Sequence, residues 1–257
     1  MAANIRAASA LIREAAVGGA RFIATPENTT LMAADAGAKL ASSHSEAGDP
    51  ALPVFAALAK ELGVHLLIGS LAIKVSETRT ANRSFLFAPD GQVTARYDKI
   101  HLFDVALSGS EAYAESNTVA GGASAVLAGT PWGRIGMSVC YDVRFPQLYR
   151  RLALGGAFAF TVPSAFTVPT GEAHWHVLLR ARAIENGAFV FAPAQGGTHD
   201  NGRMTYGHSL IIDPWGTVLV EAGTDPGVIF ADIDPAASAA ARAKLPNLRH
   251  ARDFAGP

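Results

Sequence analysis

The 257-residue chain contains only one cysteine, Cys140. One cysteine cannot form an internal disulfide, so the fold does not depend on such cross-links, and the cytoplasm is the expected compartment. A lone thiol is most often a small buried hydrophobic group. It is also the only thiol nucleophile that this chain possesses, so the residues around it decide between the two interpretations.

The chain also lacks an excess of charge of either sign and lacks long apolar runs. It has 21 Lys and Arg against 22 Asp and Glu, without a long basic segment. Nucleic acids and anionic membranes are therefore not expected as partners. No apolar run approaches the roughly 20 residues that span a bilayer. These absences leave a small molecule as the expected partner of a site on this chain.

Apolar residues make up 49% of the chain, enough to bury one large core. No linker interrupts the sequence, which predicts a single domain over residues 1–257. Turn signals at Asp90-Gly91 and Pro214-Trp215-Gly216 indicate two hairpins, and other strands alternate with helices. The pattern predicts an α/β (α+β) fold in which helices cover the outer faces of a mixed sheet. Helices are expected over 2–16, 52–62, 146–154 and 172–186, strands over 21–25, 64–73, 84–89, 92–97, 134–140, 157–162, 188–193, 208–213, 217–221 and 227–233, and a surface excursion with one helical turn over 31–49.

The stretch from Gly136 to Tyr149 changes from a strand pattern to a helix pattern just after Cys140. A thiol at the end of a strand, facing the first turn of a helix, lies near backbone N–H groups and the positive end of the helix dipole. Such surroundings favour the thiolate. We therefore expect a lowered pKa for Cys140.

Two further functional side chains follow strand-like runs in the same way. Glu27 follows the run 22–26, and Lys99 follows the run 93–98. With Cys140 they supply a general base, a cation that stabilises an oxyanion, and a nucleophile, which are the groups that acyl transfer requires. A lone Glu or Lys in such a place is ordinarily a solvated surface residue. The hypothesis of a hydrolytic site therefore rests on the three residues together.

Other polar features predict no site. Ser138 lies in a segment similar to a serine nucleophile elbow, but cysteine occupies the last glycine position of that motif and Ser138 is two residues from the strand end. His174 and His176 are two residues apart and point to different faces of a helix. His199 and His208 add no zinc-ligand spacing. Neither a metal nor another cofactor is expected.

Four short blocks carry the candidate residues and are spread in order along the chain: Pro26-Glu27, Tyr97-Asp-Lys99-Ile-His-Leu102, Glu115-Ser116 and Cys140-Tyr-Asp-Val-Arg-Phe-Pro146. These blocks resemble the signature blocks of the nitrilase superfamily, the carbon–nitrogen hydrolases. Later blocks, such as Thr170-Gly-Glu-Ala-His-Trp175, resemble the Nit branch, which contains deaminated-glutathione amidase and omega-amidase. The resemblance covers nearly all of the chain from residue 3 onward.

The resemblance implies a four-layer α-β-β-α sandwich with two mixed sheets and a cytoplasmic amidase without a cofactor. It makes Glu27 the general base, Lys99 the oxyanion stabiliser and Cys140 the nucleophile. Glu115 matches an additional glutamate that orients the substrate and Lys99. The implied chemistry is attack of the thiol on an amide, release of ammonia, and hydrolysis of the thioester. The rival from another class is a non-catalytic scaffold or binding module with this fold, against which the four intact residues argue.

The substrate implied by the resemblance is a small amide that bears a carboxylate. Deaminated glutathione is the first candidate, and omega-amides of 2-oxo dicarboxylic acids are the second. We expect Arg144 to bind the carboxylate because a guanidinium matches it in shape and charge. A structural ion pair between Arg144 and Asp142 is the equal alternative. Tyr141, Phe166 and Thr170 are expected to contact the substrate as well.

Two expectations concern the ends of the chain. The C-terminal segment, about 235–257, is polar but carries apolar residues such as Leu245 and Phe254. In the resembled family such tails run across a partner subunit, which implies a homodimer or a higher even oligomer. The family also opens with an apolar strand before its first helix, and no such strand precedes the helix here. We therefore expect that a first strand is missing at the N-terminus.

Overall fold

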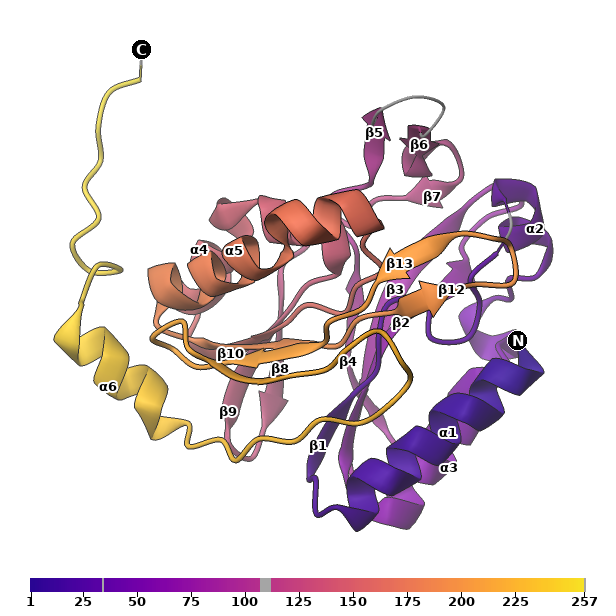
Figure 1. Ribbon diagram of the computed structural model, residues 1–257, viewed down its shortest axis with the longest axis horizontal. Helices are drawn as coiled ribbons and strands as arrows, with labels where there is room; N and C mark the ends of the chain where they lie inside the picture. The colour runs from indigo at the N-terminus through magenta and orange to yellow at the C-terminus, as the bar shows by residue number, and fades with distance from the viewer. Residues whose placement is uncertain (34, 107–111, 257) are drawn as a thin grey trace.

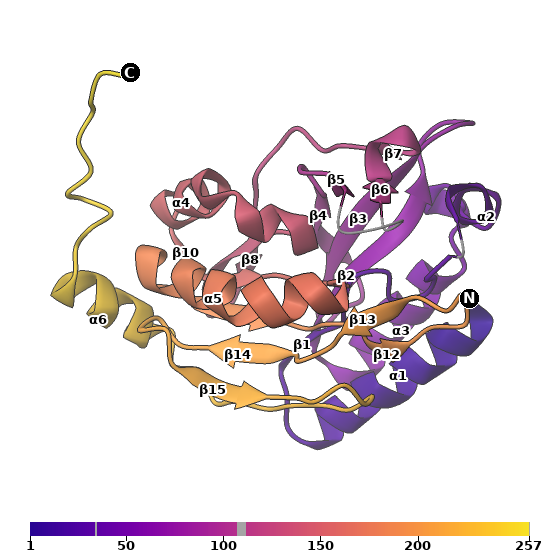
Figure 2. The same ribbon diagram turned by 45° about the horizontal axis from the view of Figure 1, so that its top comes forward.

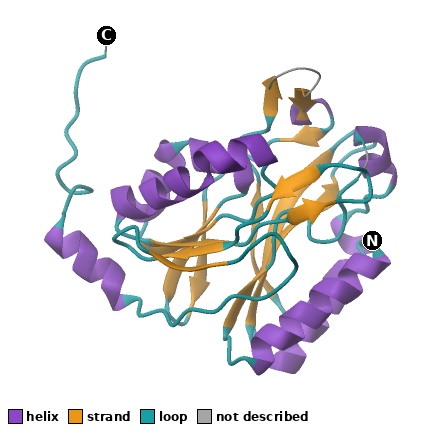
Figure 3. Ribbon diagram, viewed as in Figure 1, coloured by secondary structure: helices purple, strands orange, loops and turns teal. Residues whose placement is uncertain are grey.

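In the computed structural model, which describes residues 1–33, 35–106 and 112–256, two β-sheets stack between two layers of helices (Figure 1). Coloured by secondary structure, the strands form the interior and the longer helices lie outside (Figure 3). This is the four-layer α-β-β-α arrangement that the family resemblance implied. No helix in these residues is long and apolar enough to cross a membrane.

The first sheet is built from β1 (Phe22–Ala24), β2 (His65–Lys74), β3 (Thr80–Phe87) and β4 (Val93–Asp98), in that order, with β7 (Val119–Ala120) beside β3. The β1–β2 pair is parallel and the next two pairs are antiparallel, so the sheet is mixed. Its outer face is covered by α1 (Ala2–Val17) and α3 (Ala51–Leu62) (Figure 1). Ile12 and Phe55 of these helices are buried in one cluster with Phe85 of the sheet.

The second sheet has the order β15-β14-β11-β10-β9-β8. These strands are β8 (Val126–Thr130), β9 (Gly133–Met137), β10 (Ala157–Thr161), β11 (Phe189–Ala192), β14 (Leu210–Ile212) and β15 (Val218–Glu221). The three central strands are parallel, and α4 (Pro146–Leu154) and α5 (Val168–Asn186) provide the helical layer. Tyr149 and Trp175 of these helices are fully buried in the largest apolar cluster.

Aromatic contacts join the inner faces of the two sheets. The rings of Phe22 and Phe191 are 5.8 Å apart, and those of His65 and Trp132 are 5.3 Å apart. Phe22 and His65 begin β1 and β2, and Trp132 lies in the turn between β8 and β9, so these contacts fix one sheet on the other. The candidate catalytic residues Glu27, Lys99 and Cys140 follow the opposite, C-terminal ends of their strands.

Short elements surround this edge of the sandwich: α2 (Ala36–Ala41), β5 (Asp104–Ala106), β6 (Ala112–Ala114), β12 (Gly196–Thr198), β13 (Met204–Tyr206) and the 3₁₀-helices η1 (Glu46–Gly48), η2 (Glu115–Asn117) and η3 (Cys140–Arg144). The Asp35 side chain caps α2 by accepting the Ala38 N–H at 2.8 Å. The last helix, α6 (Ala236–Lys244), packs beside β10. The segment that follows is held beside α4 and α5 through Asn247 and Leu248, and residues 251–256 then extend away from the sandwich (Figures 1 and 2).

Both hairpin predictions are confirmed. The β3–β4 turn places Gly91 at φ 85°, and the β14–β15 turn places Gly216 at φ 86°, a region that glycine adopts without steric cost. The excursion over 31–49 contains the expected helical turn as α2, while position 34 lies outside the described residues.

The strand predicted over 227–233 is wrong, because the structure has no strand there. Val228 and Ile233 pack against apolar clusters, but the backbone between them joins neither sheet. The apolar run therefore reflects partial burial of a few side chains without strand pairing. The helix predicted from Glu172 begins earlier, at Val168, with Pro169 in its first turn, where proline is tolerated.

Candidate active site

The four predicted catalytic residues come from separate elements and line one pocket. Glu27 follows β1, Lys99 follows β4, Glu115 opens η2, and Cys140 opens η3 after β9. The pocket has a volume of about 820 Å³. The fold therefore brings together the carboxylates, the ammonium and the thiol, which are up to 113 positions apart in the sequence (27 to 140).

Lys99 lies between the two glutamates. Its Nζ is 3.2 Å from Glu27 Oε1 and 2.8 Å from Glu115 Oε2, and its side chain is only 2% exposed. The backbone N–H of Phe103 donates to the same Glu115 oxygen at 2.7 Å. Buried charges persist when they are paired and hydrogen-bonded, as these are. The network fixes the position of the ammonium.

Asn82 of β3 connects the two glutamates, and the sequence analysis missed it. Its Nδ2 donates to Glu27 Oε1 at 2.8 Å and lies 3.3 Å from Glu115 Oε1. The residue is buried and stands just before the predicted strand start at residue 84. The only available signal was a polar residue next to an apolar run, which is too common to identify a site.

The charges of this network reinforce one another. Burial alone would lower the pKa of Lys99, but the negative charges of Glu115 and Glu27 raise it well above its ordinary value. Burial alone would raise the pKa of Glu115, but the charge and hydrogen bond of Lys99 bring it down to about 2. Glu115 and Lys99 are thus held in their charged forms at neutral pH.

Cys140 adopts an unusual backbone conformation. Its φ is 50°, in the left-handed region that non-glycine residues rarely occupy, and its N–H donates to the Pro163 carbonyl at 2.9 Å. Such a conformation costs on the order of 1–3 kcal/mol and persists only where the surrounding structure imposes it. It places the thiol in the pocket, beside Glu27 and the backbone amide of Ala165.

The expected lowering of the Cys140 pKa is wrong for this structure. Burial and the negative charge of Glu27 raise the pKa of the thiol, and the positive charge of Lys99 only partly opposes them. The segment after the strand is a five-residue 3₁₀-helix, so few aligned peptide dipoles face the sulfur. The thiol is protonated at rest, and its deprotonation requires an adjacent base.

The two alternatives for Arg144 are distinguished by the contacts of Asp142. The fully buried Asp142 carboxylate accepts the hydroxyl of Tyr97 at 2.7 Å and the backbone N–H groups of His101 and Val139. No ion pair joins it to Arg144 in the described chain. Asp142 therefore holds the turn after Cys140, and the ion-pair alternative is wrong.

Arg144 instead belongs to the pocket wall. Its guanidinium lies over the rings of Tyr141 and Phe166, at 5.8 and 5.4 Å from their centroids, and both of its terminal nitrogens are 3.3 Å from His174 Nδ1. Tyr141, Phe166 and Thr170 line the same pocket, as predicted. All eight predicted site residues are therefore brought together, although their roles stay predictions.

Two cations of the pocket were also missed. Lys39 reaches it from α2, and Arg203 reaches it from the loop between β12 and β13. Arg203 donates to the Ala165 carbonyl at 3.0 Å and lies over the Tyr113 ring at 5.3 Å. Lys39 lies in no block of the family resemblance, and Arg203 opens the block Arg203-Met-Thr-Tyr-Gly-His208, from which no role was predicted for it. Basic residues in loops and short helices are usually solvated. Only the folded chain brings them to the site.

Of the features that the sequence analysis set aside, His174 contacts Arg144 at the pocket wall, whereas Ser138, His176 and His208 lie elsewhere. Ser138 is fully buried and hydrogen-bonded to Tyr149 at 2.6 Å, outside the pocket. His176 and His208 both hydrogen-bond to Glu221 Oε1, at 3.0 and 2.7 Å. This trio forms the one group in the described residues whose ligand atoms could surround a metal ion, which the spacing argument did not anticipate.

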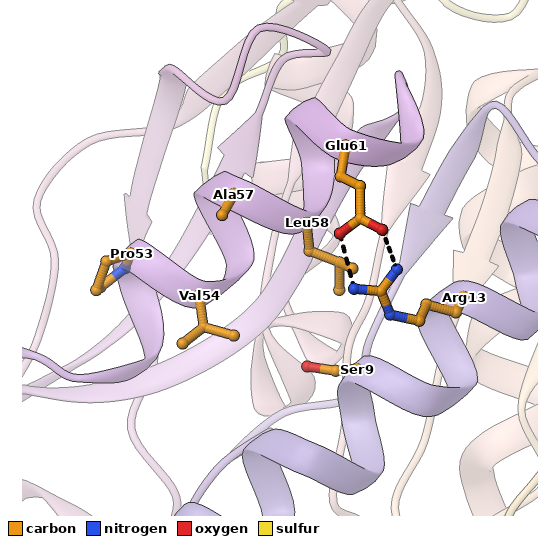
Figure 4. A pocket seen from close by; sticks show the side chains of 7 residues that line it. All are labelled: Ser9, Arg13, Pro53, Val54, Ala57, Leu58 and Glu61. Atoms are coloured by element: carbon orange, nitrogen blue, oxygen red, sulfur yellow. Dashed lines mark hydrogen bonds and ion pairs between the residues drawn. The ribbon is translucent and has the colours of Figure 1, made fainter.

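A second hollow lies between the outer helices α1 and α3 (Figure 4). It is crossed by an exposed pair in which Arg13 Nη2 donates to Glu61 Oε2 at 2.7 Å. None of the candidate catalytic residues lines it. The pocket around Cys140 is therefore the candidate active site.

Comparison with known proteins agrees with this geometry. Residues 1–243 match the model of the carbon–nitrogen hydrolase family. A deaminated glutathione amidase of Synechocystis is 42% identical over 96% of this chain and 92% of its own length. The NitFhit protein of C. elegans has a similar structure, with a TM-score of 0.90 and 35% identity over 97% of this chain, which spans 61% of that longer protein. A mutant amidase from Nesterenkonia sp. AN1 also has a similar structure, with a TM-score of 0.76 and 26% identity over 92% of this chain and 89% of its own. In that structure acrylamide has added to the active-site cysteine.

Proposed function

This chain belongs to the carbon–nitrogen hydrolase family and is an amidase, and we propose that its substrate is deaminated glutathione. The observation that carries this proposal is the charge of the pocket. Lys39, Arg144 and Arg203 line it without a carboxylate partner in the described structure. Deamination removes the only cationic group of glutathione and leaves its carboxylates. An anionic amide of this kind therefore complements the pocket.

In the proposed first step, Glu27 accepts the thiol proton and the Cys140 sulfur attacks the amide carbon. The former carbonyl oxygen becomes an oxyanion, which the Lys99 ammonium stabilises. Glu27 then gives its proton to the leaving nitrogen, the C–N bond breaks, and an acyl thioester remains on Cys140. This order suits a thiol whose raised pKa keeps it protonated until a base acts on it.

In the second step, Glu27 takes a proton from water, and the hydroxide attacks the thioester carbon. Collapse of the second oxyanion releases the carboxylic acid and restores the thiol. The leaving group depends on the substrate. A primary amide releases ammonia, as expected from the sequence, whereas deaminated glutathione has a substituted amide nitrogen and releases an amine. Glu115 keeps the Lys99 ammonium in place through both steps.

The proposed roles of the pocket wall follow from its contacts. Arg144 binds one carboxylate of the substrate, because its guanidinium is held by two rings and by a histidine rather than by an acid. Phe166 and Thr170 shape the space beside the acyl group, and the backbone around Tyr141 contributes N–H groups near the oxyanion. This arrangement orients the amide carbon toward the sulfur.

The proposed enzyme is a cytoplasmic homodimer or higher even oligomer. In support of assembly, Phe254 is 91% exposed and Leu245 is 51% exposed, on a segment that extends from the sandwich (Figure 1). Apolar side chains on an extended tail gain free energy if a partner subunit covers them. Sedimentation at micromolar concentration tests this, and a monomer of 26.7 kDa would contradict it.

The substrate proposal is tested by comparing hydrolysis of deaminated glutathione, followed as release of a free amine, with hydrolysis of omega-amides of 2-oxo dicarboxylic acids, followed as release of ammonia. We expect kcat/KM to be at least tenfold higher for deaminated glutathione. A higher kcat/KM for the omega-amides would contradict the proposal and identify the omega-amides as the substrate class. Absence of hydrolysis of both, with no acyl adduct on Cys140 by intact mass, would refute the proposal.

A further inference from the structure

The candidate active site contains more cationic side chains than the one, Lys99, that is paired with its glutamates. Four cationic side chains line the pocket, against the three carboxylates of Glu27, Asp35 and Glu115. Lys99 is paired with both glutamates, and Asp35 caps α2. Lys39, Arg144 and Arg203 form no ion pair in the described structure. Three cations in one partly closed pocket repel one another unless an anion enters it.

Lys39 has the fewest contacts of the three. It projects from α2 into the pocket, and its Nζ has no hydrogen bond or ion pair with any residue that the structure describes. Burial lowers the pKa of Lys39, and the charges of Lys99 and Arg203 lower it further, although Glu115 and Glu27 oppose this. An ammonium in these surroundings becomes more stable when an anion binds beside it.

Arg203 lies near Lys39 and is held rigidly. One terminal nitrogen donates to the Ala165 carbonyl at 3.0 Å, and the guanidinium lies over the Tyr113 ring. Its Nε is buried and has no hydrogen-bond partner. Because this Nε has no surface open to the pocket, a ligand would contact Arg203 through the rest of its guanidinium. The guanidinium has no carboxylate partner in the described structure, so a carboxylate in the pocket could bind it together with the Lys39 ammonium.

Arg144 is attached to a different part of the pocket wall. It belongs to η3, just before α4, and contacts His174 of α5. In Figures 1 and 2, α2 lies on one side of β7 and α4 lies on the other. The cations thus fall into two groups on separate elements, with Arg144 in one and Lys39 with Arg203 in the other.

We propose that Lys39 and Arg203 form a second carboxylate subsite, so that the pocket selects amides with a carboxylate at each end. This inference rests on the proposed function and narrows it. Deaminated glutathione carries two carboxylates, one on each side of its amide bonds. An omega-amide of a 2-oxo dicarboxylic acid carries only one. Lys39 is thereby a specificity-determining residue for the dianionic substrate.

The test compares Lys39→Met with the wild type on three substrates: deaminated glutathione and two analogues, each with one of its carboxylates converted to a carboxamide. We expect Lys39→Met to lower kcat/KM for deaminated glutathione by roughly 10- to 100-fold, mainly through KM, because a charged hydrogen bond is lost. The loss should be as large for the analogue that keeps the carboxylate bound at Lys39. It should be less than threefold for the other analogue.

Two control variants accompany this comparison. Lys39→Arg keeps the charge and should recover most of the activity on the dianion. Lys60→Met removes an exposed lysine of α3, outside the pocket, and should leave all three substrates unaffected. An equal loss on all three substrates would overturn the proposal, since Lys39 would then act through Glu115 and Lys99. No loss on any of them would overturn it as well.

If the proposed function is wrong, the wild type will not hydrolyse deaminated glutathione, and this result is distinct from a failure of the second subsite. In that case the subsite is measured by protection of Cys140 from iodoacetamide, with a series of dicarboxylates and matching monocarboxylates as probes. Stronger protection by a dicarboxylate, lost in Lys39→Met and kept in Lys60→Met, would support the second subsite. Equal protection by mono- and dicarboxylates would refute it.

Discussion

Replacing Glu115 by glutamine should destabilise the protein in a manner that depends on pH. The folded-state pKa of Glu115 is about 2, below its ordinary value of 4.5. A carboxyl group whose pKa falls on folding stabilises the native state above its unfolded pKa and loses that contribution as the pH falls through the folded pKa. The difference of about 2.5 pKa units corresponds to on the order of 3 kcal/mol at neutral pH. Glutamine keeps the shape of the side chain but not its charge.

We expect Glu115→Gln to lower the free energy of unfolding by an amount that is constant between pH 7 and 5 and shrinks from pH 4.5 toward pH 2. Urea unfolding, followed by the tryptophan fluorescence, to which the buried Trp175 contributes, measures this at each pH. Glu172→Gln, an exposed substitution near the start of α5, is the control and should show no such trend. A difference for Glu115→Gln that is unchanged down to pH 3 would show that Lys99 does not hold this carboxyl ionised.

Three further predictions concern the chemistry of the pocket. Cys140→Ala should abolish hydrolysis and the acyl adduct seen by intact mass, and retention of more than a few per cent of activity would contradict the covalent mechanism. Arg144→Lys should raise KM strongly for anionic amides and little for neutral ones, whereas equal losses on both would assign it a structural role. Glu27→Gln should abolish hydrolysis yet speed alkylation of Cys140 by iodoacetamide at pH 8, because the charge of Glu27 raises the thiol pKa. Slower alkylation in that variant would mean that Glu27 activates the thiol even without substrate.

The sequence predicted those parts of the structure that depend on local or strongly patterned signals. Hairpins at Gly91 and Gly216 followed from turn chemistry, because a positive φ is required there. The candidate catalytic residues followed from the family resemblance, since each lies in a short block of fixed pattern. The strand over 227–233 did not form, because an apolar pattern specifies which side chains are buried and says nothing about backbone partners.

Long-range polar contacts were the part that the sequence could not predict. Asn82 meets Glu27 across 55 positions, and Arg203 meets the Ala165 carbonyl across 38. Lys39 reaches the pocket only because a short helix folds over its edge. Such contacts depend on how separate elements pack together. A single sequence shows no periodicity from which they could be read.

The expected lowering of the Cys140 pKa was wrong for the same reason, since that pKa also depends on long-range packing. Position in the sequence indicated a helix start and hence a thiolate, but the pKa of the thiol depends on burial and on Glu27, which arrives from 113 positions away (27 to 140). A protonated thiol reacts slowly with oxidants and electrophiles, since the thiolate is the reactive species. A buried thiol beside a carboxylate therefore reacts slowly until a substrate lies over the sulfur and Glu27 can transfer the thiol proton to it. In the proposed mechanism the cations of the pocket select an anionic amide for that step, and Lys99, held by two glutamates, stabilises the oxyanion as soon as it forms.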